Sequence, residues 1–271
     1  ICLNDTSVVD LMKHLRIAKA RVALIIAFAD LSGEWKLTKI TKGLSDFAEI
    51  ALNLSVNFLL KDGINSGNLY HDIINNDYAN NSGYVMLAMG KLGGYELNYS
   101  SDIDLIVLFD IEVVKYCGKR SPQDFFIKLT QKLVKIMSDR TADGYVFRTD
   151  LRLRPDPGAT PVALSMEGAE IYYQTVGLNW ERAAMIKARP IAGDITEGHH
   201  FLDRIRGFVW RRYLDYAAIA DIHAIKKLIQ ERYSHRGIML EGHDVNLARG
   251  GIREFVCYTQ INQLISGGSE P

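Results

Sequence analysis

Two closely spaced aspartates followed by an unbroken apolar run constrain the fold of this chain more than any other feature of its sequence. Residues 106–109 read Ile-Val-Leu-Phe, and a strand that is apolar at every position is typical of one covered on both faces. Asp102 and Asp104 stand two residues apart at the start of this strand, predicted over residues 102–110, so both side chains project from one face. The sequence therefore predicts a central, buried strand that presents two carboxylates at its first residues.

The two carboxylates indicate a metal site. Like charges held this close repel each other, and both ionise at low cost only where a cation compensates them. Hard oxygen ligands of this kind suit Mg²⁺ or Mn²⁺. The alternative is that an Asp-x-Asp pair at a strand start is simply a polar edge or turn, and an isolated pair leaves that alternative open.

A glycine-rich segment precedes this strand and strengthens the metal-site interpretation. Residues 84–90 form an apolar run of strand length, and Gly90, Gly93 and Gly94 follow at its end. Glycines let a backbone approach a phosphate closely, so that its amides can bind anionic oxygen. A tight turn that needs glycine for its dihedral angles is the alternative. Lys91 is either a phosphate contact or a solvated turn residue.

A third acidic residue lies on another predicted strand, over residues 145–154. By parity Arg148, Asp150, Arg152 and Arg154 share one face. If this strand lies beside the first, Asp150 completes a cluster of three carboxylates, and the arginines can grip phosphate oxygens with two hydrogen bonds each. An exposed edge strand with salt bridges is the alternative.

Helical periodicity dominates the rest of the chain. Helices are predicted over residues 7–31, 38–60, 121–139, 166–176, 180–189 and 198–233, with Gly33 and Gly63 as stops of the first two. Lys187 and Arg189 fall near the end of one predicted helix, where cations are favourable. The expected class is α+β: a helical lead-in over residues 1–80, a mixed-sheet core over 81–195 and a helical domain over 196–271.

Composition excludes several classes of protein. The 271 residues include 32 basic and 32 acidic ones, so no broad electrostatic footprint for nucleic acid or a membrane surface is expected. The longest apolar stretch, residues 22–29, is far short of the roughly 20 residues that span a bilayer. Three cysteines far apart predict neither a zinc site nor a disulfide framework, so reduced cytoplasm is the expected location. The first residue is Ile1, and we expect a fragment of a longer chain.

Beyond these patterns, the wording of the sequence resembles one family closely. Residues 90–105 read Gly-Lys-Leu-Gly-Gly-Tyr-Glu-Leu-Asn-Tyr-Ser-Ser-Asp-Ile-Asp-Leu, and residues 147–155 read Phe-Arg-Thr-Asp-Leu-Arg-Leu-Arg-Pro. With Asn-Trp-Glu-Arg at 179–182, Lys-Ala-Arg-Pro at 187–190 and Arg-Gly-Gly-Ile-Arg-Glu at 249–254, these segments resemble the bifunctional glutamine synthetase adenylyltransferase/adenylyl-removing enzymes. The wording is closest to the amino-terminal, AMP-removing nucleotidyltransferase domain of that family, which carries two such domains in one chain. The likeness runs from about residue 83 to the end.

The resemblance implies roles for particular residues. Asp102, Asp104 and Asp150 would bind the metal ions and be catalytic. The remaining candidates for nucleotide or phosphate binding are Lys91, Gly93, Gly94, Ser101, Arg152, Arg154, Lys187 and Arg189. The sequence after the last glycine turn departs from the family, because residues 255–258 read Phe-Val-Cys-Tyr where an Ile-Glu-Phe wording is usual. The part played by that helix is therefore open.

The resemblance also implies an activity and partners. Phosphate would attack the phosphorus of AMP on a tyrosine of adenylylated glutamine synthetase, releasing ADP and the free hydroxyl. Expected partners are glutamine synthetase, a PII-type signalling protein and the second nucleotidyltransferase half of the same chain, with glutamine controlling direction. The alternatives are ATP-dependent adenylyl transfer on the same scaffold, or a non-catalytic module that binds nucleotide or the PII-type protein.

Overall fold

The computed structural model describes residues 7–70, 77–210 and 251–266. Within it the chain divides into two compact units. The first comprises Ile1–Tyr172 and Lys187–Asp203, and the second comprises Tyr173–Ile186 and Arg204–Pro271. All the aspartates singled out above lie in the first unit, which also contains the sheet.

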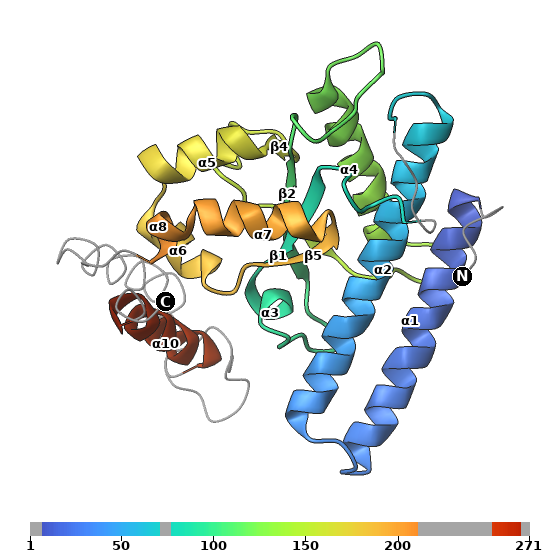
Figure 1. Ribbon diagram of the computed structural model, residues 1–271. Helices are drawn as coiled ribbons and strands as arrows, with labels where there is room; N and C mark the ends of the chain where they lie inside the picture. Colours follow the sequence, from blue (N-terminus) through green and yellow to red (C-terminus); the bar gives the residue numbers. More distant parts are fainter. Residues whose placement is uncertain (1–6, 71–76, 211–250, 267–271) are drawn as a thin grey trace. The chain divides into compact units, whose positions relative to one another are not determined.

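A mixed sheet forms the centre of the first unit (Figure 1). Its strands are β1 (Tyr84–Ala88), β2 (Ile103–Phe109), β3 (Thr149–Asp150), β4 (Leu164–Ser165) and β5 (Arg189–Gly193). The order is β3-β2-β1-β5, with β1 antiparallel to both β2 and β5. On its other side β2 pairs in parallel with β3 at its start and with β4 at its end. The prediction that this strand is central is confirmed.

Helices cover both faces of the sheet. Tyr84 and Phe109 are register partners, so they share a face, and both stack on Phe126 of α4 (Pro122–Ser138) with ring centroids 5.5 and 4.9 Å apart. On the opposite face, a Cβ at Gly198 of α7 (Ile195–Arg204) would lie 3.1 Å from Val85. Every residue of β1 is therefore buried, which explains its continuous apolar sequence.

Two long helices pack beside the sheet as an antiparallel pair, α1 (Val8–Leu31) and α2 (Leu37–Asn65) (Figure 1). Ser7 and Asp10 form a reciprocal capping box at the start of α1. The guanidinium of Arg16, which is 1% exposed, donates to the carbonyls of Gly144 and Asp139 at 2.9 and 2.5 Å. These bonds tie α1 to the segment that leads from α4 to β3.

The second unit is helical in the part that the structure describes. It contains α6 (Asn179–Met185), α8 (Arg206–Val209) and α10 (Ile252–Ser266). Buried Arg182 donates to the carbonyls of Phe208 and Val209 at 3.0 and 3.3 Å, and Ile261 and Leu264 of α10 pack against Ala183 and Ile186. Helix α5 (Met166–Thr175) precedes α6 in the chain.

Several predicted boundaries differ from the structure. Gly63 lies inside α2, which ends at Asn65 before Gly67 at φ +70°. The helix predicted over residues 180–189 ends at Met185, and Arg189 instead begins β5. Pairing with β1 makes residues 189–193 a strand, because the neighbouring strand, which is distant in sequence, outweighs the local helical periodicity. The helix predicted over 198–233 begins at Ile195 and is interrupted at Ile205, and its part beyond residue 210 lies outside the described residues.

None of the helices in the described ranges combines the length and the apolar character that crossing a membrane requires.

The packing of α2 predicts a sharp contrast between two neighbouring positions. Leu52 is fully buried, whereas Ile50 is 57% exposed on the same helix. We expect Leu52→Ala to lower the free energy of unfolding by about 2–5 kcal/mol, because it leaves a cavity in the core. Ile50→Ala is the matched control and should change it by about 0.5 kcal/mol or less. Urea denaturation measures both, and equal losses would contradict this packing.

Candidate functional site

The parallel pairing of β2 and β3 brings the predicted carboxylates together. Asp104 and Asp150 are register partners, and Ile103 is paired with Thr149 one position earlier. Asp102 directly precedes β2, two residues before Asp104. The sequence predicted a three-carboxylate cluster only if these two strands are neighbours, and they are.

Asp104 experiences the charge of the other two aspartates. Its half-buried carboxyl has a pKa raised to about 6, first because burial disfavours the ionised form and then because Asp150 and Asp102 repel a further negative charge. Lys91 and Arg152 act in the opposite direction but do not offset the increase. The site thus holds negative charge that a cation would compensate.

Asp102 is held by an arginine. Arg148 Nε donates to Asp102 Oδ1, its Nη2 donates to the carbonyl of Ser100 at 2.8 Å and its Nη1 donates to the hydroxyl of Tyr145 at 3.1 Å. The hydrogen bond that Arg148 donates to Asp102 raises the pKa of Arg148. Both side chains of the ion pair are about half exposed, at 51% and 50%, so solvent reaches this pair.

Asp150 is held by the next arginine along the chain. Arg152 donates to it from its backbone amide at 2.8 Å and from Nε at 3.0 Å, and these bonds keep the pKa of Asp150 below its usual value. The Arg152 side chain is 83% exposed, while that of Asp150 is 18% exposed. Solvent therefore reaches the guanidinium of Arg152, while the carboxylate of Asp150 is largely covered.

The strand predicted over residues 145–154 is much shorter than expected, and its parity argument fails after Asp150. The chain turns at Leu151, so Arg152 folds back onto Asp150. Arg154 donates to the carbonyls of Leu151, Pro157 and Thr160 at 2.8, 2.9 and 3.0 Å. Arg154 therefore supports the turn that follows β3 and has its hydrogen bonds there.

The glycine segment forms a single helical turn, α3 (Gly90–Gly93), rather than an open loop. A Cβ at Gly90, whose φ is +53°, would lie 2.8 Å from Asp104 Oδ2, so the backbone is in contact with the carboxylate. A Cβ at Gly93 would lie 1.9 Å from the carbonyl oxygen of Lys187. The amides of Gly93 and Gly94 donate to the carbonyls of Met89 and Gly90 at 3.1 and 3.2 Å. These glycines thus provide close packing, and Gly90 is the one that touches the acidic site.

The other predicted residues lie around this turn with partners of their own. Lys187 Nζ donates to Glu96 at 2.6 Å, and Arg189 Nη1 donates to Glu49 at 2.7 Å. Arg189 also lies 3.9 Å over the ring of Tyr95. Its Nε and Nη2 are buried and find no hydrogen-bond partner among the described residues.

Two predicted residues remain. The hydroxyl of Ser101 donates to Asn98 Oδ1 at 2.7 Å in the loop before β2, whereas Lys91 is exposed on α3. Sequence reasoning did not anticipate the two carboxylates in this region. Glu96 faces Lys187, and Glu49 faces Arg189. Glu49 is on α2, far from the site in sequence, and only the packing of α2 against β5 brings it there.

The three aspartates suit a divalent cation in their chemistry, although the side chains of Asp102 and Asp150 are turned to arginines. No three His, Cys, Asp or Glu side chains in the described residues are close enough together to be a metal-ligand group. Asp102 faces Arg148 and Asp150 faces Arg152. Asp104 is the carboxylate with a raised pKa, first because of burial and then because of the charges of Asp150 and Asp102. Oxygen donors alone fit Mg²⁺ or Mn²⁺.

An α+β fold whose mixed sheet carries such an acidic site beside a glycine turn is that of a nucleotidyltransferase-type protein. Comparison of the sequence with models of protein families identifies the particular family. The family model of glutamate-ammonia ligase adenylyltransferase (GlnE) matches residues 2–204, and the chain belongs to this family.

Individual relatives agree with the family match. The chain is 49% identical over 261 residues, 96% of its length, to a protein of Mesorhizobium japonicum named bifunctional glutamine synthetase adenylyltransferase/adenylyl-removing enzyme. Proteins of the same name from Rhizobium meliloti and Xanthobacter autotrophicus are each 49% identical over 97% of the chain. The chain spans about a quarter of the length of these relatives, 26% in each case.

The raised pKa of Asp104 predicts a dependence of stability on pH. Between pH 3.8, the ordinary pKa, and about 6, the native state holds a proton that the unfolded chain has lost. The free energy of unfolding therefore falls as pH rises through this window and is constant above it for this group. We expect Asp104→Asn to be more stable than the parent at pH 7 in EDTA, with the difference shrinking toward pH 4.

Thermal unfolding at both pH values measures this effect. Asp203→Asn, an exposed aspartate on α7, is the control and should show no such trend. A difference between Asp104→Asn and the parent that is the same at pH 4 and pH 7 would contradict the charge cluster.

The glycine turn predicts opposite outcomes for two adjacent positions. Gly93→Ala places a methyl group against the backbone of Lys187, which cannot move without shifting β5, so we expect a loss of several kcal/mol of stability. At Gly94 the nearest atoms are 3.2–3.3 Å away on the flexible side chains of Lys187 and Glu96, so Gly94→Ala should cost about 1 kcal/mol or less. Denaturant melts compare the two, and equal tolerance would contradict the close approach.

Proposed function

We propose that this chain removes AMP from an adenylylated tyrosine of glutamine synthetase by metal-dependent phosphorolysis. The observation that carries the proposal is the register pairing of Asp104 with Asp150, with Asp102 two residues before it. The name of the relatives, which contains both adenylyltransferase and adenylyl-removing activities, supports a reaction of AMP on glutamine synthetase. The wording of residues 90–105, similar to the AMP-removing half of the family, supports the direction.

Asp102, Asp104 and Asp150 are the residues that would hold Mg²⁺ or Mn²⁺. When bound, the metal supplies charge neutralisation at the phosphoryl group and alignment of the attacking and leaving oxygens. Gly90 lets the backbone approach the Asp104 carboxylate closely, because a Cβ at this position would lie 2.8 Å from Asp104 Oδ2. Arg148 fixes the loop before β2 through the carbonyl of Ser100, so it positions Asp102.

The reaction needs an anion-binding group for inorganic phosphate, and we assign it to Arg152 and Lys91. Arg152 is highly exposed and bound only to Asp150 in the described residues, so it can transfer its guanidinium to a phosphate oxygen. An oxygen of hydrogen phosphate attacks the phosphorus of AMP, the bond from phosphorus to the tyrosine oxygen breaks, and the tyrosine oxygen takes up the proton that the attacking phosphate loses. The products are ADP and the unmodified tyrosine, so atoms and charge balance.

Lys187 and Arg189 have a different role in this proposal. Their carboxylate partners, Glu96 and Glu49, hold them beside α3, and they line the approach to the glycine turn rather than bind the attacking phosphate. A PII-type signalling protein and glutamine would act as regulators through parts of the protein outside this site.

The decisive experiment incubates the chain with adenylylated glutamine synthetase, Mg²⁺ and inorganic phosphate and follows ADP release. We expect release that depends on phosphate and that Asp104→Asn lowers on the order of a hundredfold or more. Arg152→Ala should raise the KM for phosphate about tenfold with a smaller effect on kcat, because it removes one charge-assisted contact. Asp203→Asn, which changes an exposed aspartate on α7, serves as the control.

Two outcomes would overturn the proposal. Labelling of unmodified glutamine synthetase from ATP, without phosphate-dependent ADP release, would mean that the chain transfers AMP instead. Absence of both activities in a folded chain that still binds nucleotide would identify a regulatory module.

A further inference from the structure

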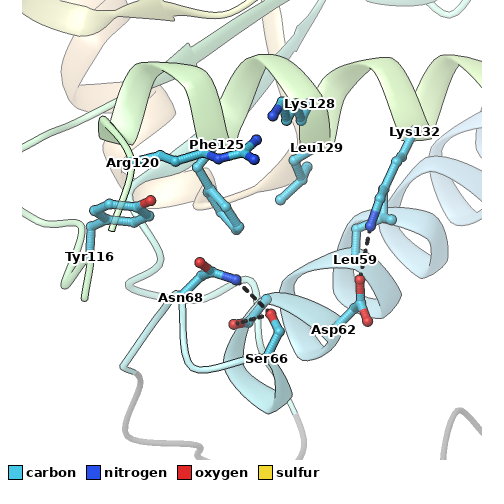
Figure 2. Close-up of a pocket in the computed structure, with 11 residues that line it drawn as sticks. Leu59, Asp62, Ser66, Asn68, Tyr116, Arg120, Phe125, Lys128, Leu129 and Lys132 are labelled. Atoms are coloured by element: carbon cyan, nitrogen blue, oxygen red, sulfur yellow. Dashed lines mark hydrogen bonds and ion pairs between the residues drawn. The ribbon is translucent and has the colours of Figure 1, made fainter. Parts of the chain in front are cut away.

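A second candidate binding site lies at the other end of β2 from the aspartates. It is a cavity of about 240 Å³ between the last turns of α2, the loop after β2 and α4 (Figure 2). The residues that line it are Leu59, Asp62, Gly63, Ser66, Asn68, Tyr116, Arg120, Phe125, Lys128, Leu129 and Lys132. We refer to it as the Arg120 pocket.

The Arg120 pocket has an excess of positive charge. Arg120, Lys128 and Lys132 face a single carboxylate, Asp62, and Lys132 is bound to that carboxylate at 3.1 Å. In the part of the chain that the structure describes, neither Arg120 nor Lys128 has an ion-pair partner. In Figure 2 both side chains lie on the α4 side of the pocket, near Phe125. Two cations without a carboxylate at one cavity favour an anionic ligand.

The walls of the pocket are built before any ligand arrives. The backbone amide of Cys117 donates to the backbone carbonyl of Asn68 at 2.9 Å, and the backbone amide of Tyr70 donates to the backbone carbonyl of Lys115 at 2.9 Å. These bonds join the turn after α2 to the loop after β2. The rings of Tyr116 and Phe125 lie 5.5 Å apart at 48°. A ligand therefore meets a preformed wall and loses little affinity to ordering it.

Polar groups opposite the cations complete the site. Asn68 Nδ2 donates to Ser66 Oγ at 2.8 Å, and Ser66 Oγ donates to the carbonyl of Gly63 at 3.0 Å (Figure 2). The side chain of Asn68 thus lies across the cavity from Arg120. It can hydrogen-bond a polar atom of a ligand whose anionic group lies between Arg120 and Lys128.

The size of the cavity limits the ligand. Pockets that enclose drug-sized ligands measure about 300–1,000 Å³, so a cavity of about 240 Å³ suits a small ion or metabolite and does not enclose a whole nucleotide. We propose that the Arg120 pocket binds a small anion, a phosphate group or a carboxylate of a small metabolite, at a site separate from the three aspartates.

Such binding would reach the aspartates through the framework that the pocket shares with them. The pocket joins α2 to α4, and Ser138 at the end of α4 accepts from the amide of Thr149 at 3.2 Å and donates to the carbonyl of Phe147 at 3.1 Å. An anion that draws α2 and α4 together therefore acts on the helix that holds β3. The proposal concerns a different site from the proposed reaction and stands independently of it.

The test is a titration of the ¹⁵N-labelled chain with inorganic phosphate and, separately, with succinate, followed by amide chemical shifts. We expect saturable shifts at Ser66, Asn68 and Lys128 with at least one of the two probes. The double variant Arg120→Ala, Lys128→Ala should weaken that binding about tenfold or more, because each removed cation takes away a charge-assisted contact. Lys135→Ala, an exposed lysine on α4 outside the pocket, is the matched control and should bind as the parent does.

Each outcome decides the proposal. Saturation by phosphate alone or by succinate alone supports the site and identifies a phosphoryl or a carboxylate ligand. Absence of saturable shifts with both probes overturns it, as does equal affinity in the double variant and the parent. Phosphate shifts confined to Lys91 and Asp104 would overturn the Arg120 pocket while leaving the catalytic proposal intact, so the two proposals fail separately.

Discussion

The register between β2 and β3 places Asp104 opposite Asp150, and the electrostatics of this region follow from that pairing. Two carboxylates on neighbouring strands and a third two residues earlier concentrate charge that a folded chain does not accept without compensation. Arg148 and Arg152 provide it for Asp102 and Asp150. Asp104 has no arginine on its carboxylate among the described side chains, and its pKa rises, first because of burial and then because Asp150 and Asp102 repel a further negative charge. The same uneven compensation leaves one place in the site where an added cation would be stabilised.

Local sequence predicted the elements whose signals are local. The buried apolar strand β2 and the long helices predicted over residues 7–31 and 121–139 were all interpretable from spacing and residue type. The wording around Asp102 and Asp104 also indicated the family, which the comparisons confirm. For the site residues themselves, the structure supplies their arrangement, and their roles stay predictions.

The elements that sequence reasoning missed depend on distant partners. Arg189 belongs to β5 because β1 is beside it, and no periodicity within residues 180–189 reports that neighbour. Arg154 leaves the face predicted by parity because the chain turns after Asp150 and offers it three carbonyls. The backbone of Lys187 requires glycine at position 93, a contact that no local pattern reports, while the phosphate-binding role of Gly93 stays a prediction. For Arg189 and Arg154, a tertiary contact overrides the structure that the local pattern predicts.

The contacts of α1 have a consequence for how small a working version of this unit can be. Arg16 binds the carbonyls of Asp139 and Gly144, and Lys19 donates to the carbonyl of Val146 at 2.8 Å while its ammonium lies 3.4 Å over the ring of Phe147. The helix thus supports the segment that delivers Asp150 to β2. A shortened chain beginning at Gly83 would retain all three aspartates in its sequence but would lack the support that brings the third to the other two. The shortest chain that keeps the three aspartates together therefore begins with α1, although α1 contains none of these aspartates.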